Sequence, residues 1–279
     1  LRRRGRRASR GRGVSLRLFR QTLYWQRIRL VVVGLVAFGW GALVPTFYTT
    51  FQDLFAGLVE GGFPENLLNF GSGSLFTLGG AMTIGVQHPL GIAFVGIFAV
   101  GAAAGAVAGE RETGTLEVLL ARPLSRRKLY VSVGVAIVVA IGLTLALLLA
   151  GQVLSINLLG VADEIDQWQV PMVWVNGMLL WGAFAAFSLA ASVSFDRRGP
   201  AIGLSLAYLG INYFFEILGS FLPDLDWTQE YSLFHHFNPG EIVTGNLDPF
   251  DLALLGVAVV LPVVWALVVF PRRDLAAPA

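Results

Sequence analysis

The sequence predicts an all-α polytopic membrane protein with six transmembrane helices. Hydrophobic residues make up 55% of the 279 residues and charged residues only 14%, whereas a soluble domain carries about 25% charged residues. Mean hydropathy is +0.68. The charges are gathered in short segments between apolar windows that can each hold a spanning helix of about 20 residues. The absence of cysteine excludes a disulfide framework and a thiolate metal site.

The N-terminal arm is expected to have two parts. Residues 1–13 are rich in Arg, Gly and Ser and are predicted to be a disordered basic tail. Residues 14–29, "VSLRLFRQTLYWQRIR", place apolar and aromatic side chains between arginines. This pattern favours an amphipathic helix lying at the membrane interface. A charge cluster that only sets the orientation of the chain explains the same residues.

A transmembrane domain is predicted over 30–279. Its six spans are expected at about 30–50, 89–109, 129–152, 171–195, 199–222 and 250–270. Pro89 and Pro171 suit the first turns of helices. The apolar window 66–109 is longer than one span needs. We therefore expect residues 75–87 to rest at or dip into the membrane surface, or to form part of an extra span.

The basic residues decide between these span counts. With six spans, all 20 Lys and Arg residues fall on one side of the membrane. They lie in the N-terminal arm, in the segment 111–128, at Arg197 and Arg198, and at Arg272 and Arg273. Most carboxylates fall on the opposite side. The positive-inside rule then places both termini in the cytoplasm of a multi-pass cell-membrane protein.

The segment "AGERETGTLEVLLARPLSRRKL", residues 108–129, is a polar insert between the second and third spans. Thr115 is predicted to cap a short helix whose apolar face holds Leu116, Leu119 and Leu120. Pro123 should end this helix, and Ser125 should cap the next span. The spacing of Gly109, Gly114 and Thr115 is similar to a P-loop, but the required Lys is missing and no strand precedes it, so no ATPase site is predicted.

This insert resembles the cytoplasmic signature of ABC-2 type permease subunits of ABC transporters, including the copper-enzyme-maturation and multidrug-type subfamily. The resemblance rests on an acidic pair, a Gly-Thr step, a Leu-rich stretch and a Pro-x-Ser-Arg sequence. The rest of the chain matches more loosely, through a basic amphipathic N-terminus and six spans. The matching residues that the resemblance implies for coupling to an ATPase are Glu110, Glu112, Gly114, Thr115, Glu117, Pro123, Ser125 and Arg126.

The resemblance implies the membrane subunit of an ATP-driven transporter, expected to be an exporter. The chain is not expected to be an enzyme or to hold a cofactor, because ATP would be bound by a separate cytoplasmic ATPase subunit. A second permease copy, forming a homodimer or heterodimer, and membrane lipids are the other expected partners, and nucleic acid is not one. The alternatives are a membrane scaffold or anchor that does not transport, and a secondary transporter.

A polar stripe crosses the fifth predicted span. Ser205, Tyr208, Asn212 and Glu216 are spaced to share one helix face. An ionisable residue inside a membrane favours a substrate path, so Tyr208, Asn212 and Glu216 are candidate pathway residues. A structural hydrogen bond between Asn212 and Glu216 is the alternative. The adjacent His235 and His236 have no third ligand placed by the sequence, so no metal site is predicted.

Overall fold

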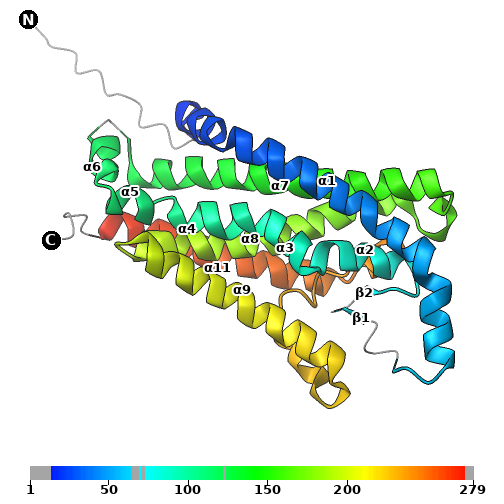
Figure 1. Ribbon diagram of the computed structural model, residues 1–279. Helices are drawn as coiled ribbons and strands as arrows, with labels where there is room; N and C mark the ends of the chain where they lie inside the picture. The colour runs from blue at the N-terminus through cyan, green and yellow to red at the C-terminus, as the bar shows by residue number, and fades with distance from the viewer. Residues whose placement is uncertain (1–13, 65–68, 71–72, 122–123, 274–279) are drawn as a thin grey trace, which may run out of the picture.

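The computed structural model describes residues 14–64, 69–70, 73–121 and 124–273, and forms a bundle of long helices (Figure 1). The predicted tail 1–13 lies outside these residues. In the described part, five helices are long and apolar enough to cross a membrane, and a bent helix pair brings the number to six if it counts as one span. The long helices are α1 (Leu16–Glu60), α7 (Arg126–Leu159), α8 (Val170–Ser194), α9 (Arg198–Phe221) and α11 (Pro249–Arg272).

Helix α1 is one continuous helix of 45 residues. The sequence predicted an interfacial helix over 14–29 and a separate span over 30–50, but no break divides the two. The reason is local, because the chain around residues 29 and 30 holds neither glycine nor proline to interrupt the helical hydrogen bonds. Arg17, Arg20 and Trp25 are exposed on its first turns. Gly61 ends the helix, and Gly62 follows with a φ of 93°.

Helices α1 and α7 run side by side in Figure 1 and touch through glycines. A side chain on Gly41 would collide with the backbone carbonyl of Leu148 on α7. Across the same contact, a side chain on Gly151 would collide with the carbonyl of Phe38. Small residues allow helix backbones to approach this closely inside a membrane. This contact holds the N-terminal helix against the centre of the bundle.

Residues 75–87, expected to rest at or dip into the membrane surface or to form part of an extra span, contain helix α2 (Leu78–Gln87), and all ten residues of this helix are buried. Helix α2 is therefore enclosed by other parts of the protein. Its axis is bent by 49° from the helical segment that follows Pro89. Carbonyl groups of α2 accept side-chain hydrogen bonds: Trp40 Nε1 donates to Gly85 O at 2.7 Å, and Gln152 Nε2 donates to Met82 O at 3.0 Å. These side-chain donors link α2 to α1 and to α7.

The predicted span 89–109 is not a regular α-helix. It consists of α3 (Pro89–Gly96), a π-helical segment η2 (Ile97–Ala102) and α4 (Ala103–Gly105), and a break separates these from α5 (Ala108–Glu112). At the break, Ser192 Oγ accepts hydrogen bonds from Val107 N at 2.9 Å and Ala108 N at 3.0 Å. A small-residue run rich in Gly and Ala packs closely but leaves the helix easily interrupted.

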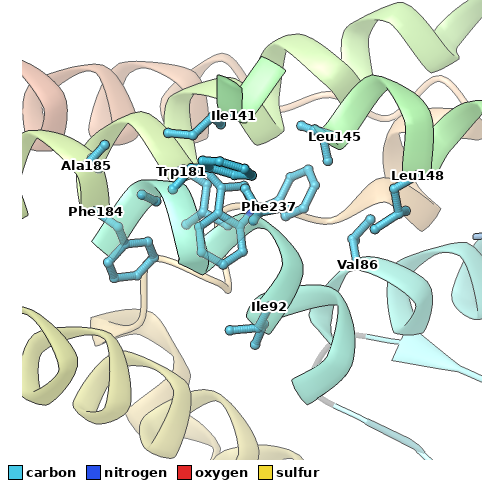
Figure 2. Packing of buried hydrophobic residues seen from close by; sticks show 14 of the residues in the cluster. Val86, Ile92, Ile141, Leu145, Leu148, Trp181, Phe184, Ala185 and Phe237 are labelled. Atoms are coloured by element: carbon cyan, nitrogen blue, oxygen red, sulfur yellow. The ribbon is translucent and has the colours of Figure 1, made fainter. Parts of the chain in front are cut away.

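The core contains aromatic side chains from helix α8 and from a loop (Figure 2). Trp181 and Phe184 on α8 contact Phe234, and all three are almost fully buried together with Phe237. Phe234 and Phe237 come from the segment between η5 (Pro223–Tyr231) and α10 (Pro239–Val243), which the sequence predicted as an external loop. Part of that loop therefore enters the bundle and fills its core.

The two ends of the bundle differ in charge. We call the end that holds α5, α6 (Thr115–Leu120), the α8–α9 turn, the start of α7 and the end of α11 the basic end. The opposite end, the acidic end, holds η3 (Ala162–Glu164), η4 (Gln167–Gln169), η5 and α10. Next to α2, a short antiparallel pairing joins β1 (Asn69–Phe70) to β2 (Gly73–Ser74). The first described residues and Arg273 both lie at the basic end (Figure 1).

Candidate functional site

The insert at the basic end consists of two short helices joined by a tight turn. Helix α5 ends at Glu112, and Gly114 has a φ of 72°, a left-handed conformation that favours glycine. Helix α6 then begins at Thr115 with Gly114 as its N-cap, so the prediction of Thr115 as the cap is wrong by one position. Glu117 lies in the first turn, where a carboxylate suits the helix dipole.

Hydroxyl and carboxylate groups hold this turn together. Thr115 Oγ1 donates to the backbone carbonyl of Glu110 at 3.1 Å and also contacts the Glu110 carboxylate. The Thr113 and Thr115 hydroxyls lie 2.9 Å apart, and Thr113 Oγ1 donates to Gly109 O at 3.0 Å. Helices α5 and α6 are therefore linked by side-chain hydrogen bonds as well as by the backbone.

Glu112 connects the insert to a distant helix. Its Oε2 accepts a hydrogen bond from Arg198 N, the first residue of α9, at 3.0 Å. The four N-terminal N–H groups of a helix lack partners within that helix, and a carboxylate there also suits the helix dipole. Glu112 thus acts as a capping group for α9 from another part of the chain.

An ion-pair cluster that the sequence analysis did not identify lies beside this contact. Asp196 in the α8–α9 turn pairs with Arg111 of α5, with 2.9 Å between Arg111 Nη1 and Asp196 Oδ1. It also pairs with Arg273, whose Nη1 donates to Val193 O at 2.8 Å. The side chain of Arg111 is 9% exposed and that of Asp196 is 45% exposed. The sequence signal for this cluster was Asp196 itself, a single carboxylate next to Arg197 and Arg198 in a basic segment.

Arg126 joins the far end of the insert to the last helix. Ser125 caps α7 as predicted, with its Oγ accepting from Lys128 N at 3.2 Å. Arg126 Nη1 donates to Phe270 O at 3.2 Å and Pro271 O at 3.3 Å at the end of α11. A cation at a helix C-terminus satisfies the last carbonyls and suits the dipole. Pro123, the remaining predicted residue, lies outside the described residues.

Helix α6 has one buried side and one exposed side. Leu116 is 2% exposed, and the other two predicted apolar positions, Leu119 and Leu120, are partly buried. Glu117 and Val118 are exposed, Val118 at 66%. The insert therefore presents Glu117 and Val118 away from the bundle. We call these two residues the α6 exposed face.

The polar stripe on α9 faces the protein interior. Ser205, Asn212 and Glu216 are buried and Tyr208 is partly buried, while much of the rest of α9 is exposed. Asn212 Nδ2 donates to Tyr208 O at 2.9 Å, and its Oδ1 accepts from Leu233 N at 2.9 Å. These bonds tie Asn212 to the loop after η5. Tyr208 stacks on Phe187 with 4.1 Å between ring centroids.

The histidines have structural partners at the acidic side of the bundle. His88 caps α3 through Nδ1, which accepts from Leu90 N at 3.3 Å. His236 lies 2.7 Å from Asp251, measured between Nδ1 and Oδ1. The pKa of His235 is below its ordinary value, because part of its ring is packed against the protein and because the His236 imidazole adjoins it. Within the described ranges, no group of three or more His, Asp or Glu side chains is arranged to hold a metal ion.

The fold and the insert together define a polytopic helical membrane protein in which hydrogen bonds hold a polar insert between two spans. A family model described as ABC-2 family transporter protein matches residues 18–275, and the chain belongs to that family. Members of this family are membrane components of ABC transporters. No curated protein matches the chain.

Proposed function

We propose that this chain is the permease subunit of an ATP-driven exporter and that the insert couples it to a separate ATPase subunit. One observation carries the proposal: the insert is bonded to three other parts of the bundle. Glu112 binds the start of α9, Arg111 binds the α8–α9 turn, and Arg126 binds the end of α11. A displacement of the insert would therefore move several spanning helices together.

The α6 exposed face is the proposed contact for the ATPase. Val118 is an apolar side chain that the described part of this chain leaves exposed, and the exposed Glu117 lies beside it. Protein interfaces have an apolar centre with charged residues at the rim. The Gly114 turn and the Thr115 hydrogen bonds hold this face in a defined orientation, which reduces the entropy lost on binding.

The membrane orientation follows from charge. We place the basic end in the cytoplasm, because positively charged segments near spans stay on that side. Arg17 and Arg20, exposed on the first turns of α1, would contact the phosphates of the inner leaflet. The exposed apolar side chains of α1, α9 and α11 would face lipid or a second permease copy. Tyr208, Asn212 and Glu216 are proposed to line the transport path.

The test is a pair of substitutions on the α6 exposed face. Glu117→Arg with Val118→Arg should abolish co-purification with the partner ATPase subunit and should stop ATP-driven flux in vesicles. Trp168→Arg is the matched control, because Trp168 is 91% exposed at the acidic end. Wild-type association and flux in the double variant would refute the coupling role. ATPase binding without ATP-driven flux in the wild-type chain would instead identify a scaffold.

A further inference from the structure

The helical stretch that leads into the insert is irregular at two successive places. Residues Ile97–Ala102 form the π-helical segment η2, and α4 ends at Gly105, before the break that precedes α5. A π-helical turn closes its hydrogen bonds one residue further along than an α-helical turn, and such turns are frequent at functional sites. The helices α7 and α8, which pack beside this stretch, are continuous over 34 and 25 residues. The stretch between α3 and the insert is therefore less regular than its neighbours.

Gly101 lies inside η2 and leaves one side of this segment unpacked. A Cβ added at Gly101 would meet no heavy atom of the described residues within 4 Å, and one added at Gly96, just before η2, would meet its nearest atom at 3.9 Å. A glycine inside a helix weakens that helix by about 1 kcal/mol relative to alanine. The segment therefore combines a weakened backbone with space in which it can bend.

Ser192 of α8 satisfies the backbone at the second irregular place. In a continuous α-helix, the N–H groups of Val107 and Ala108 would donate to the carbonyls of residues 103 and 104. They donate instead to Ser192 Oγ, at 2.9 Å and 3.0 Å, and Ser192 is fully buried. A buried N–H group without a partner is costly. The Ser192 hydroxyl therefore allows the helix to be interrupted here without that cost.

The two sides of the irregular stretch are held by different parts of the bundle. On one side, α2 is buried, its Met82 carbonyl accepts from Gln152 of α7, and α3 follows directly. On the other side, α5 is held to the α8–α9 turn by Arg111 and to the start of α9 by Glu112. A displacement of the insert would therefore move the start of α9, while α2 remains held in the core.

We propose that residues 97–107 are a hinge through which the insert and the start of α9 move as one unit relative to α2 and α3. Hinges are short segments that absorb the change in backbone angles between two rigid parts. This inference rests on the proposed coupling function and adds the place where the movement of the insert is absorbed. A continuous helix in place of the hinge would transmit the displacement into α3 and would resist it.

The first test makes the hinge regular. A variant that lacks Gly101 has one residue fewer in η2, so this turn can close as an α-helix. The variant should still bind the partner ATPase subunit and should unfold at the wild-type temperature or above, but ATP-driven flux in vesicles should fall by about tenfold. Gly101→Ala, which stiffens the helix without removing a residue, should lower flux by several-fold. Wild-type flux in the folded deletion variant would overturn the hinge.

Gly256→Ala is the matched control. A Cβ added at Gly256 of α11 also meets no heavy atom of the described residues within 4 Å, so this variant gives the same gain in helix propensity outside the hinge. It should keep wild-type flux. If the deletion variant fails to fold, Gly101→Ala decides: flux at the wild-type level, or an equal loss in Gly256→Ala, would overturn the proposal.

The second test follows the movement itself. The sequence has no cysteine, so spin labels can be placed on pairs of introduced cysteines. Leu90 of α3, Ala121 after α6 and Leu204 of α9 are exposed. In the complex with the ATPase subunit, a non-hydrolysable ATP analogue should change the distance between labels at Leu90→Cys and Ala121→Cys. The distance between labels at Ala121→Cys and Leu204→Cys should stay the same.

A constant first distance in a complex that transports, or a change in both distances, would overturn the hinge alone. Failure of the wild-type chain to bind the ATPase subunit would instead refute the coupling role, and the hinge with it.

Discussion

Glu112 and Arg198 are 86 positions apart in the chain, yet the Glu112 carboxylate caps the first backbone N–H of α9. This contact joins the polar insert to the helix that carries the buried stripe with Glu216. Because the bond is made to the backbone, it depends on the residue at 112 and not on the side chain at 198. The connection can therefore be cut by one substitution without altering α9 itself.

We expect Glu112→Ala to destabilise the folded chain by about 1 kcal/mol, the usual cost of a lost helix cap. Thermal unfolding in detergent measures this change. Glu117→Ala is the control, because Glu117 is exposed and its side chain makes no hydrogen bond within the described part of the chain. If the insert transmits movement, Glu112→Ala should also lower ATP-driven flux while ATPase binding persists. Equal unfolding temperatures for the two variants would contradict the cap.

Asp196→Asn should cost about 1–2 kcal/mol, discounted because the side chain of Asp196 is 45% exposed. The variant leaves the nearly buried Arg111 guanidinium facing a neutral amide and weakens the tie to Arg273. Asp163→Asn, an exposed change at the acidic end, should have little effect. The difference between the two variants should shrink at high salt, since salt screens ion pairs. A difference that does not change with salt would argue against an electrostatic origin.

Two glycines on α1 should respond to alanine with opposite signs. Gly41→Ala places a methyl group against the Leu148 carbonyl and should destabilise the chain by about 1–3 kcal/mol. At Gly39 no heavy atom lies within 4 Å of an added Cβ, so Gly39→Ala should stabilise by up to about 1 kcal/mol through helix propensity. Paired melting curves in one detergent test both. Similar shifts for both variants would disprove the close α1–α7 contact.

Ser192→Ala should destabilise the break before α5. It leaves the backbone N–H groups of Val107 and Ala108 without the Ser192 hydroxyl, at a cost of about 1–3 kcal/mol. Ser205→Ala is the matched buried control, since the Ser205 hydroxyl bonds only to Ala201 O one turn away among the hydrogen bonds described. Hydrogen exchange at 107 and 108 should rise in the first variant alone. Unchanged exchange there would show that Ser192 is dispensable.

The absence of cysteine makes the topology directly testable. Ser125→Cys should resist a membrane-impermeant maleimide applied to intact cells and should react after the cells are opened. Trp168→Cys, at the acidic end, should react in intact cells. Labelling of Ser125→Cys from outside would invert the orientation and remove the proposed contact with a cytoplasmic ATPase.

Residue patterns predicted the helical membrane class, because lipid allows few alternatives to a helix. The Ser125 cap was also predictable, since capping is decided within four residues. The buried position of α2 was not, because an apolar segment of ten residues looks the same in lipid as inside a protein. Asp196 was missed for a similar reason: its two partners, Arg111 and Arg273, are far away in the chain.

Helix α2 also constrains the order in which this protein can be built. Gln87, at its C-terminal end, donates to the carbonyls of Phe234 and Phe237, which the ribosome makes about 150 residues later. Until those residues emerge, the α2 segment has to wait in the translocon or at the bilayer without its final neighbours. Helix α2 can therefore reach its final contacts only after Phe237 has been made, shortly before α11 is synthesised. A chain cut short before Phe234 should be a substrate for membrane quality control.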